Sequence, residues 1–134
     1  MVRMKVYICG PMTGIPQFNL PAFDLAALEL RAAGYEVVSP GELDDPVVRA
    51  AEEASLDGSL LSNVGTWGEF LARDVRLLAD DGIRAVFVLP GWEASRGARL
   101  ETFVAHLLDM PILSLATNEA VPLWRLTVAW STGR

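Results

Sequence analysis

The chain has little of several things that would point to a particular class of protein. Its 134 residues include one cysteine, Cys9, and one histidine, His106. A single cysteine excludes an intramolecular disulfide and a multi-cysteine zinc site, and a single histidine excludes a multi-histidine metal centre. Because one cysteine also suits a reducing compartment, we expect a cytoplasmic protein that works without a metal or another cofactor.

Long hydrophobic runs are also absent. Hydrophobic residues make up 51% of the chain, but glycine, proline and charged residues divide them into short runs. None approaches the roughly 18 apolar residues that a membrane span requires. The first residues, Met-Val-Arg-Met-Lys, lead into an apolar run with no small-residue cleavage site, so we expect no signal peptide. The length predicts a single domain over residues 1–134, and we expect no membrane partner.

Basic residues are outnumbered by acidic ones. The chain has 11 Lys and Arg against 17 Asp and Glu, which gives a formal net charge of −6. Nonspecific binding to nucleic acid depends on neutralising phosphates with Lys and Arg, so we expect no nucleic-acid polymer as a partner. A small anionic ligand is still compatible with this charge, because a few local donors can outweigh the field of the whole chain.

Short apolar runs alternate with helical patterns along most of the chain. The predicted strands are 5–9, 35–39, 85–89 and 111–115. Amphipathic helices are predicted to follow the N-caps Asn19 and Thr66, and a third spans about 98–108. This order predicts an α/β fold, a Rossmann-like (flavodoxin-like) three-layer sandwich around a mostly parallel sheet of four to five strands with right-handed crossovers. Such sheets bind ligands beyond the carboxyl ends of their strands.

Two segments depart from this alternation. Segment 41–65 is acidic, and we expect a surface excursion or a lid there, with a short helix around 46–54 and the acidic run 42–45 facing solvent. Segment 116–134 carries two tryptophans among other apolar residues. We expect it to dock on the body of the domain or on a second subunit.

The stretch from Leu89 to Glu101 carries the strongest functional pattern. A strand runs into a Pro-Gly turn, then into a Ser-x-Gly loop that contains Ser95, then into a helix whose first turn or so carries Glu101. The N-terminus of a helix offers unpaired N–H groups and the positive end of a dipole, which suits an anion. The same field favours the ionised form of a nearby carboxylate, which a carboxylate nucleophile requires. The pattern therefore predicts an anion cradle beside a nucleophile.

Three segments carry a resemblance to a known family. They are Tyr-Ile-Cys-Gly-Pro-Met-Thr-Gly at 7–14, Arg-Asp-Val-Arg-Leu-Leu at 73–78 and Ser-Arg-Gly-Ala-Arg-Leu-Glu at 95–101. In order and approximate spacing they resemble the nucleoside 2-deoxyribosyltransferase superfamily. The chain looks nearest to the branch of 2'-deoxynucleoside 5'-monophosphate N-glycosidases and to relatives common in phages and bacteria. The resemblance also implies a homodimer or a higher homo-oligomer, in which residues near the C-terminus often complete the site of the partner.

The resemblance implies a role for each matched residue. Glu101 is then the nucleophile that attacks the anomeric carbon to form a covalent deoxyribosyl-enzyme, Asp74 protonates or orients the departing base, and Tyr7 positions the nucleophile. Ser95 stands where transferases of free nucleosides usually carry an aspartate that binds the 5'-hydroxyl of the sugar. Because a carboxylate there would repel a phosphate, the serine favours a deoxynucleoside 5'-monophosphate as the small-molecule substrate.

Other residues of these segments are candidates for binding the substrate. Gly10 and Gly97 permit tight turns and close approach of the backbone. Trp92 can stack on a base or cover the apolar rim of the pocket, and Arg96 and Arg99 can pair with a phosphate. The chemistry fits such a site, because glycosidic cleavage passes through an oxocarbenium-like state that a carboxylate stabilises, while the departing base needs a nearby acid.

Two other functions are compatible with the sequence. Pro90-Gly91, Gly97 and Glu101 faintly resemble the Pro-Gly-Gly-x-Gly-Thr-x-x-Glu motif of phosphoribohydrolases of the "lonely guy" type, although Trp92 replaces the second glycine. The other alternative is a non-catalytic protein that binds or sequesters a nucleotide. Hydrolysis and transfer to a second base share the covalent step, so the sequence leaves both open. It also leaves the base open, because segment 41–65 has no feature that aligns with the family.

Overall fold

A four-stranded parallel sheet forms the centre of the protein. The computed structural model describes residues 3–59, 66–80 and 82–132. The strands are β1 (Lys5–Cys9), β2 (Glu36–Val38), β3 (Ala85–Val88) and β4 (Ile112–Ser114). Their order across the sheet is β2-β1-β3-β4, and the neighbouring strands run parallel. This is the flavodoxin-like order, so the predicted α/β fold is confirmed.

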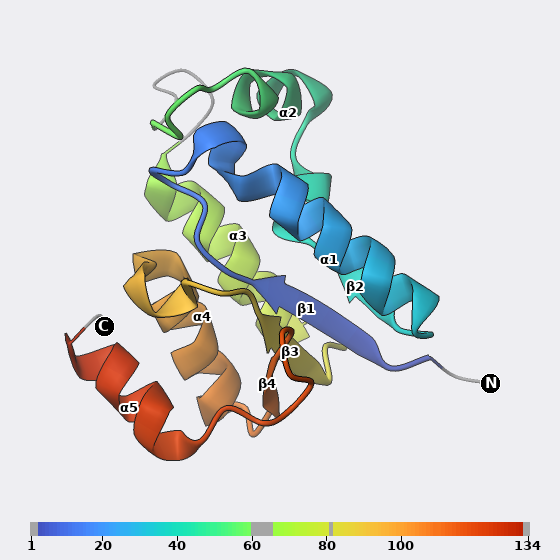
Figure 1. Ribbon diagram of the computed structural model, residues 1–134, viewed down its shortest axis with the longest axis vertical. Helices are drawn as coiled ribbons and strands as arrows, with labels where there is room; N and C mark the ends of the chain where they lie inside the picture. Colours follow the sequence, from blue (N-terminus) through green and yellow to red (C-terminus); the bar gives the residue numbers. More distant parts are fainter. Residues whose placement is uncertain (1–2, 60–65, 81, 133–134) are drawn as a thin grey trace.

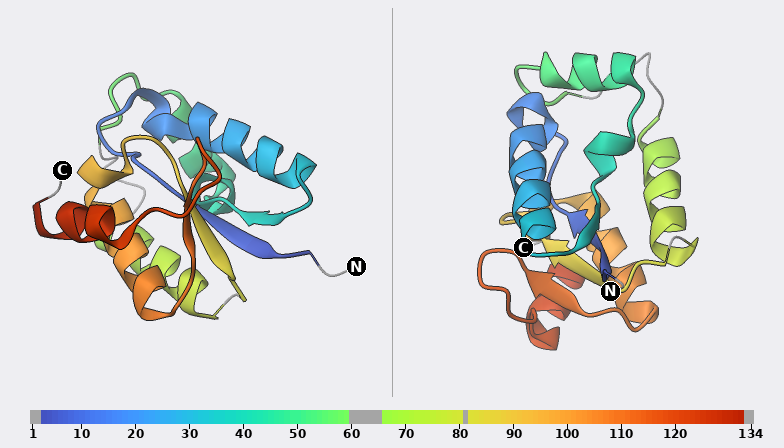
Figure 2. Two further views of the ribbon diagram at one scale, coloured as in Figure 1. Left: turned by 60° about the horizontal axis from the view of Figure 1, so that its bottom comes forward. Right: turned by 90° about the vertical axis from the view of Figure 1, so that its right-hand side faces the viewer.

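Helices on both faces of the sheet give three layers (Figure 1, Figure 2). Helix α1 (Leu20–Ala32) covers one face, while α3 (Trp67–Asp80) and α4 (Arg96–Leu107) cover the other, with α5 (Leu123–Thr132) packed against α4. Helix α2 (Pro46–Glu53) lies at the end of the molecule toward which the strands point. Three short 3-10 turns are η1 (Pro16–Asn19), η2 (Pro40–Leu43) and η3 (Trp92–Ala94). Within the described ranges, no helix is both long enough and apolar enough to cross a membrane.

Alternation along β1 sends its side chains to opposite faces of the sheet. Val6 and Ile8 pack in the cluster on the α1 side, which includes Phe23. Tyr7 and Cys9 pack in the cluster on the side of α3 and α4. A strand that is buried on both faces has a nearly continuous apolar sequence, and for this reason the strand can be predicted from the sequence. The same alternation points Tyr7 at helix α4.

The loop that leads into α1 differs from its prediction. Asn19 makes no side-chain cap; it has φ 60° and ψ 17°, and its Nδ2 donates to the carbonyl oxygen of Pro11 at 2.9 Å. Gln17 and Phe18 also have positive φ, a conformation that is costly for residues other than glycine. This left-handed turn buries Phe18 (5% exposed) on the wall of the cavity described below.

The first part of the acidic excursion folds against the loop that follows β1. Gly14 N–H donates to the carbonyl oxygen of Gly58, and Gln17 N–H donates to that of Ser55, both at 2.8 Å. The helix predicted around 46–54 is present as α2. Residues 60–65 of the excursion lie outside the described residues, so the lid stays a prediction.

The sequence predicts that the whole acidic run 42–45 faces solvent, and the structure shows that part of it is buried. The Asp44 side chain is 2% exposed and pairs with Arg73 of α3 at 2.6 Å. The prediction is therefore wrong for Asp44, because Arg73 supplies the positive charge that a buried carboxylate needs.

The C-terminal segment docks on the body of the domain, one of its two predicted outcomes. Helix α5 buries Leu126 and Ala129 in the core that it shares with α4. Trp130 Nε1 donates to Thr102 Oγ1 of α4 at 3.0 Å, which fixes the contact further. Elsewhere on the same helix the Trp124 side chain is 68% exposed.

Candidate active site

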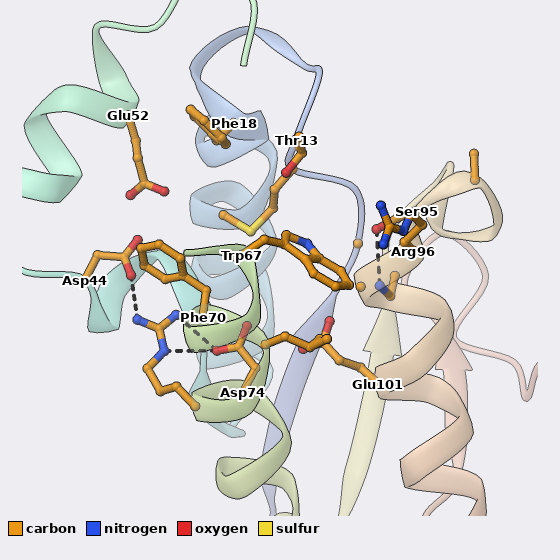
Figure 3. Close-up of a pocket in the computed structure, with 17 residues that line it drawn as sticks. Thr13, Phe18, Asp44, Glu52, Trp67, Phe70, Asp74, Ser95, Arg96 and Glu101 are labelled. Atoms are coloured by element: carbon orange, nitrogen blue, oxygen red, sulfur yellow. Dashed lines mark hydrogen bonds and ion pairs between the residues drawn. The ribbon is translucent and has the colours of Figure 1, made fainter. Parts of the chain in front are cut away.

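A cavity of about 380 Å³ opens beyond the carboxyl ends of β1 and β3. The loop after β1, the acidic excursion, helix α3 and the start of α4 line it (Figure 3). After β2 is added on one side of β1, β3 and β4 are added on the other side, so the strand order reverses between β1 and β3. Open parallel sheets bind ligands at such a switch point. The volume suits a small organic molecule held by a few polar groups.

Glu101 projects into this cavity from the second turn of α4. The helix begins at Arg96, so Glu101 lies slightly farther from the helix start than the sequence predicts. The residue is 6% exposed. The Tyr7 phenol donates a hydrogen bond to its Oε2, and the Cys9 thiol lies 3.6 Å from its Oε1. Two donors from β1 therefore hold the carboxyl group of Glu101 in place.

Asp74 lines the same cavity from α3, and Figure 3 shows its carboxylate beside Glu101. Its side chain is 13% exposed and pairs with the Arg73 guanidinium at 3.0 Å. Tyr7 has no exposed surface and stands behind Glu101, outside the cavity wall. The three residues assigned catalytic roles by resemblance thus meet at one place, although they come from β1, α3 and α4.

The two carboxyl groups share a proton near neutral pH. Burial raises the pKa of Glu101 to about 8; the Asp74 carboxylate adds to this shift, and the hydrogen bonds from Tyr7 and Cys9 oppose it. Burial also raises the pKa of Asp74 to about 6, against the lowering effect of the Arg73 guanidinium. Two facing carboxyl groups resist ionising together, so the pair carries one proton between these values.

Two opposing effects act on the ionisation of Glu101. The dipole of α4 favours the ionised form, while burial and the Asp74 carboxylate raise the pKa of Glu101. The roles implied by the resemblance need an ionised Glu101 and a protonated Asp74, which is one of the two arrangements of a single proton on the pair.

The N-terminus of α4 forms one end of the cavity. Ser95 is the N-cap, and its Oγ accepts a hydrogen bond from Ala98 N–H at 3.1 Å. Arg96 and Gly97 are the first two residues of the helix, so their N–H groups have no intrahelical acceptor. The Arg96 guanidinium lies 4.6 Å from the ring centroid of Trp67 and lines the cavity. This end therefore presents N–H groups and a guanidinium to the cavity, and the binding of an anion there stays a prediction.

The two predicted glycines serve different purposes. A Cβ at Gly10 would lie 2.8 Å from the Cβ of Leu89, so this glycine allows the ends of β1 and β3 to approach. A Cβ at Gly97 would meet nothing closer than 4.0 Å, at Glu101 Oε1 and Ser95 Oγ. Gly97 thus leaves open the space between the helix start and the carboxyl pair.

Trp92 is not part of the site, and its predicted role in stacking on a base is wrong. The residue is 2% exposed, belongs to the hydrophobic core beneath the turn η3, and does not line the cavity. Arg99 also lies outside the cavity wall; its Nε donates to the carbonyl oxygen of Ser95 at 3.4 Å. The aromatic wall comes instead from Phe18, Trp67 and Phe70, which the sequence analysis does not single out.

A row of charged side chains, which the sequence does not predict, also belongs to the site. Arg73 bridges Asp44 at 2.6 Å and Asp74 at 3.0 Å, which ties the excursion to the carboxyl pair. Glu52 of α2 lines the cavity beyond Asp44 and is 7% exposed. The only available signal is the position of the excursion after β2, because that loop ends at the ligand-binding edge of the sheet.

The donor set does not suggest a metal centre. In ranges 3–59, 66–80 and 82–132, no three His, Cys, Asp or Glu side chains come together as a set of metal ligands. Asp44 and Asp74 are instead ion-paired with Arg73, and Glu101 accepts a hydrogen bond from Tyr7.

Comparison with known proteins gives one match. Residues 4–114 match the model of the family described as Domain of unknown function (DUF4406). No curated protein and no solved structure matches the chain. The matched residues contain all four strands, the carboxyl pair and the start of α4.

Proposed function

The chain belongs to the family Domain of unknown function (DUF4406), and we propose that it is an N-glycosidase of 2'-deoxynucleoside 5'-monophosphates. The observation that carries the proposal is the meeting of Glu101, Asp74 and Tyr7 beside the N-terminus of α4. A carboxylate nucleophile, a carboxylic acid and an anion cradle are the groups that cleavage of a nucleotide's glycosidic bond requires.

The first step forms a covalent intermediate. A carboxylate oxygen of Glu101 attacks C1' of the deoxyribose, and the bond from C1' to the base nitrogen breaks with its electron pair leaving on the base. The carboxyl group of Asp74 gives its proton to the departing base and becomes a carboxylate. Tyr7 holds Glu101 in line throughout, because its phenol binds the other oxygen of the same carboxylate.

The second step releases the sugar. Water attacks C1', Asp74 takes a proton from that water, and the ester bond to Glu101 breaks to return the carboxylate. A second base in place of water would make the reaction a transfer, with the same intermediate. We favour hydrolysis because the neutral Ser95 hydroxyl, rather than a carboxylate, stands at the phosphate end of the cavity, as in the hydrolase branch.

The test is to incubate the protein with a panel of deoxyribonucleotides and ribonucleotides and to follow free base by chromatography. We expect release from deoxynucleoside monophosphates and a covalent sugar-phosphate adduct by intact-protein mass spectrometry. Glu101→Ala should abolish both. Release from ribonucleotides alone would favour the phosphoribohydrolase alternative, and tight binding without release would favour the sequestering protein.

A matched pair of variants tests the phosphate end. Ser95→Asp keeps a good N-cap for α4 but places a carboxylate where the phosphate binds, so we expect loss of activity on monophosphates. Ser95→Thr keeps both the cap and the neutral hydroxyl, and should retain activity. Equal activity of the two variants on a monophosphate would show that the phosphate binds elsewhere.

The proposal includes assembly into at least a homodimer in the cytoplasm. Both α4 and α5 expose large apolar side chains, such as Leu107 at 64% and Trp124 at 68%. Trp124→Glu should shift the protein toward monomer in sedimentation at micromolar concentration. Leu28→Glu is the control, because Leu28 is equally exposed at 65% but lies on α1, across the sheet. A monomeric wild-type protein would contradict the assembly.

A further inference from the structure

Glu52 is the least expected group in the cavity. It lies near the end of α2, is 7% exposed, and has a buried Oε1 without a hydrogen-bond partner. Figure 3 shows the side chain pointing into the cavity from the side opposite Ser95. An unsatisfied buried oxygen costs free energy, so a ligand that donates a hydrogen bond to it gains affinity.

Asp44 determines how the Glu52 carboxyl group meets a ligand. Burial raises the pKa of Glu52 to about 8, and a hydrogen bond to the neighbouring Asp44 carboxylate adds to this shift. Asp44 is ion-paired with Arg73 at 2.6 Å, and as a carboxylate it can accept a hydrogen bond but cannot donate one. Glu52 therefore keeps its proton at neutral pH and directs it to Asp44. Its second oxygen is left as an acceptor.

The cavity orders its groups as a nucleotide would need them. In Figure 3 the Ser95 end and Glu52 lie on opposite sides, with Trp67 and Phe70 between them. On the proposed function, a phosphate at Ser95 and a sugar at Glu101 place the base among the aromatic side chains. Stacking rings suit the face of a base, and Glu52 then meets its outer edge.

We propose that Glu52 selects the base: the carboxyl oxygen not bonded to Asp44 accepts a hydrogen bond from an exocyclic amino group at the outer edge of the base. The preferred ligands are then cytosine or adenine nucleotides, whose outer amino group is a donor. Uracil and hypoxanthine nucleotides carry an oxo group at the same ring position, which is an acceptor. This inference rests on the proposed function only for the direction in which the nucleotide lies.

An oxo group opposite Glu52 leaves one buried acceptor unpaired whichever way the proton points, and the ring N–H beside that oxo group can replace the lost donor only if the base shifts along its edge. If Glu52 keeps its proton on Asp44, its other oxygen faces the oxo group of the base. If Glu52 turns the proton to the base, Asp44 loses its donor. Leaving one buried acceptor unpaired corresponds to a roughly ten- to hundredfold weaker affinity.

Binding can be measured without turnover. Calorimetry on the Glu101→Gln variant compares dCMP with dUMP and dAMP with dIMP, two pairs that differ in the exocyclic amino or oxo group and in the protonation of the ring nitrogen beside it. We expect the amino member of at least one pair to bind roughly ten- to hundredfold more tightly. Glu52→Ala in the same background should make the affinities of the two members of that pair nearly equal. Glu53→Ala is the matched control, since Glu53 is the next residue of α2 but is 53% exposed and pairs with Arg49.

Glu52→Gln separates a specific contact from general damage to the pocket. Its amide can donate to Asp44 and keep an oxygen for the base, so we expect it to retain the amino preference that Glu52→Ala loses. Equal affinity within both pairs, tighter binding of the oxo members, or no binding at all would overturn the proposal. Amino-selective binding with no base release by the wild-type protein would uphold Glu52 and reject the glycosidase. Release of the base by the wild-type protein without amino-selective binding would support the glycosidase and reject the role of Glu52.

Discussion

The Tyr7 phenol donates a hydrogen bond to Oε2 of Glu101, although 94 residues separate the two along the chain. Burial, and then the Glu101 carboxyl group, raise the pKa of Tyr7 well above its ordinary value, so the phenol keeps its proton and stays a donor. Tyr7 has no exposed surface and does not line the cavity. It is therefore a positioning residue that acts on the reaction through Glu101.

Tyr7→Phe should lower kcat/KM for a deoxynucleoside monophosphate by about 10- to 100-fold, because a hydrogen bond to a charged group contributes about 1.5–3 kcal/mol. The loss of the donor should also raise the pKa of Glu101 further, since this hydrogen bond opposes the effect of burial. The pH dependence of kcat/KM measures both effects. Tyr35→Phe is the control, because Tyr35 packs edge-on against Phe87 in the cluster on the α1 side. An unchanged pH profile in Tyr7→Phe would rule out the positioning role.

The carboxyl pair predicts a bell-shaped pH dependence of kcat/KM with limbs near pH 6 and pH 8. Below the lower value both carboxyl groups are protonated and Glu101 cannot attack. Above the higher value neither holds a proton and the base leaves without an acid. Only the state with one proton on the pair reacts, whichever residue holds that proton more often.

Asp74→Asn tests which residue supplies the acid. The variant should be much slower, but its rate should rise with pH to a plateau instead of falling again, because only the ionisation of Glu101 is left. The midpoint of that rise should lie below 8, since the Asp74 carboxylate helps to raise the pKa of Glu101. A bell that survives the substitution would assign the acid to another group.

Glu101 should also make folding stability depend on pH. Its pKa rises from 4.5 in the unfolded chain to about 8 in the fold, so the folded protein binds the proton more tightly. This contribution is complete below pH 4.5, declines as pH rises, and is lost above about 8. Glu101→Gln removes the dependence, and we expect its free energy of unfolding to gain about 2–4 kcal/mol relative to wild type between pH 5 and pH 9. Urea unfolding at several pH values measures it, and parallel stability curves for the two proteins would contradict it.

The sheet, Glu101 and Ser95 can be predicted from the sequence for a physical reason, whereas Asp74 is predicted only by the resemblance. Strands buried on both faces must be apolar throughout, and helices on a sheet must carry one apolar stripe, so both leave periodic signals. Parallel strands also bring the loops that follow them to one edge, and this rule alone is enough to place Glu101 and Ser95 at the site. The register of β1 then decides that Tyr7 faces Glu101.

The other walls of the site depend on contacts that leave no local signal. Trp92 and Trp67 look alike in sequence, but the turn η3 directs the first into the core, while the first turn of α3 leaves the second beside Arg96. Asp44 reads as a surface charge because burial of a carboxylate is costly. Arg73, 29 residues away, supplies the positive charge that makes that burial possible. Sequence periodicity does not report such a pairing.

Gly97→Ala should stabilise the protein and weaken ligand binding at once. A Cβ at this position meets no atom closer than 4.0 Å, so the fold accommodates it, and alanine in place of glycine within a helix contributes about 0.5–1 kcal/mol. The same methyl group projects into the space between Ser95 and Glu101, where the phosphate and sugar are proposed to bind. Thermal unfolding and calorimetry with a deoxynucleoside monophosphate should therefore move in opposite directions. Gly68→Ala on α3 is the matched control, since its Cβ is equally unobstructed at 3.9 Å but lies outside this cavity, and it should leave affinity unchanged. If Gly97→Ala binds the nucleotide as tightly as the wild type does, the ligand does not bind at the start of α4.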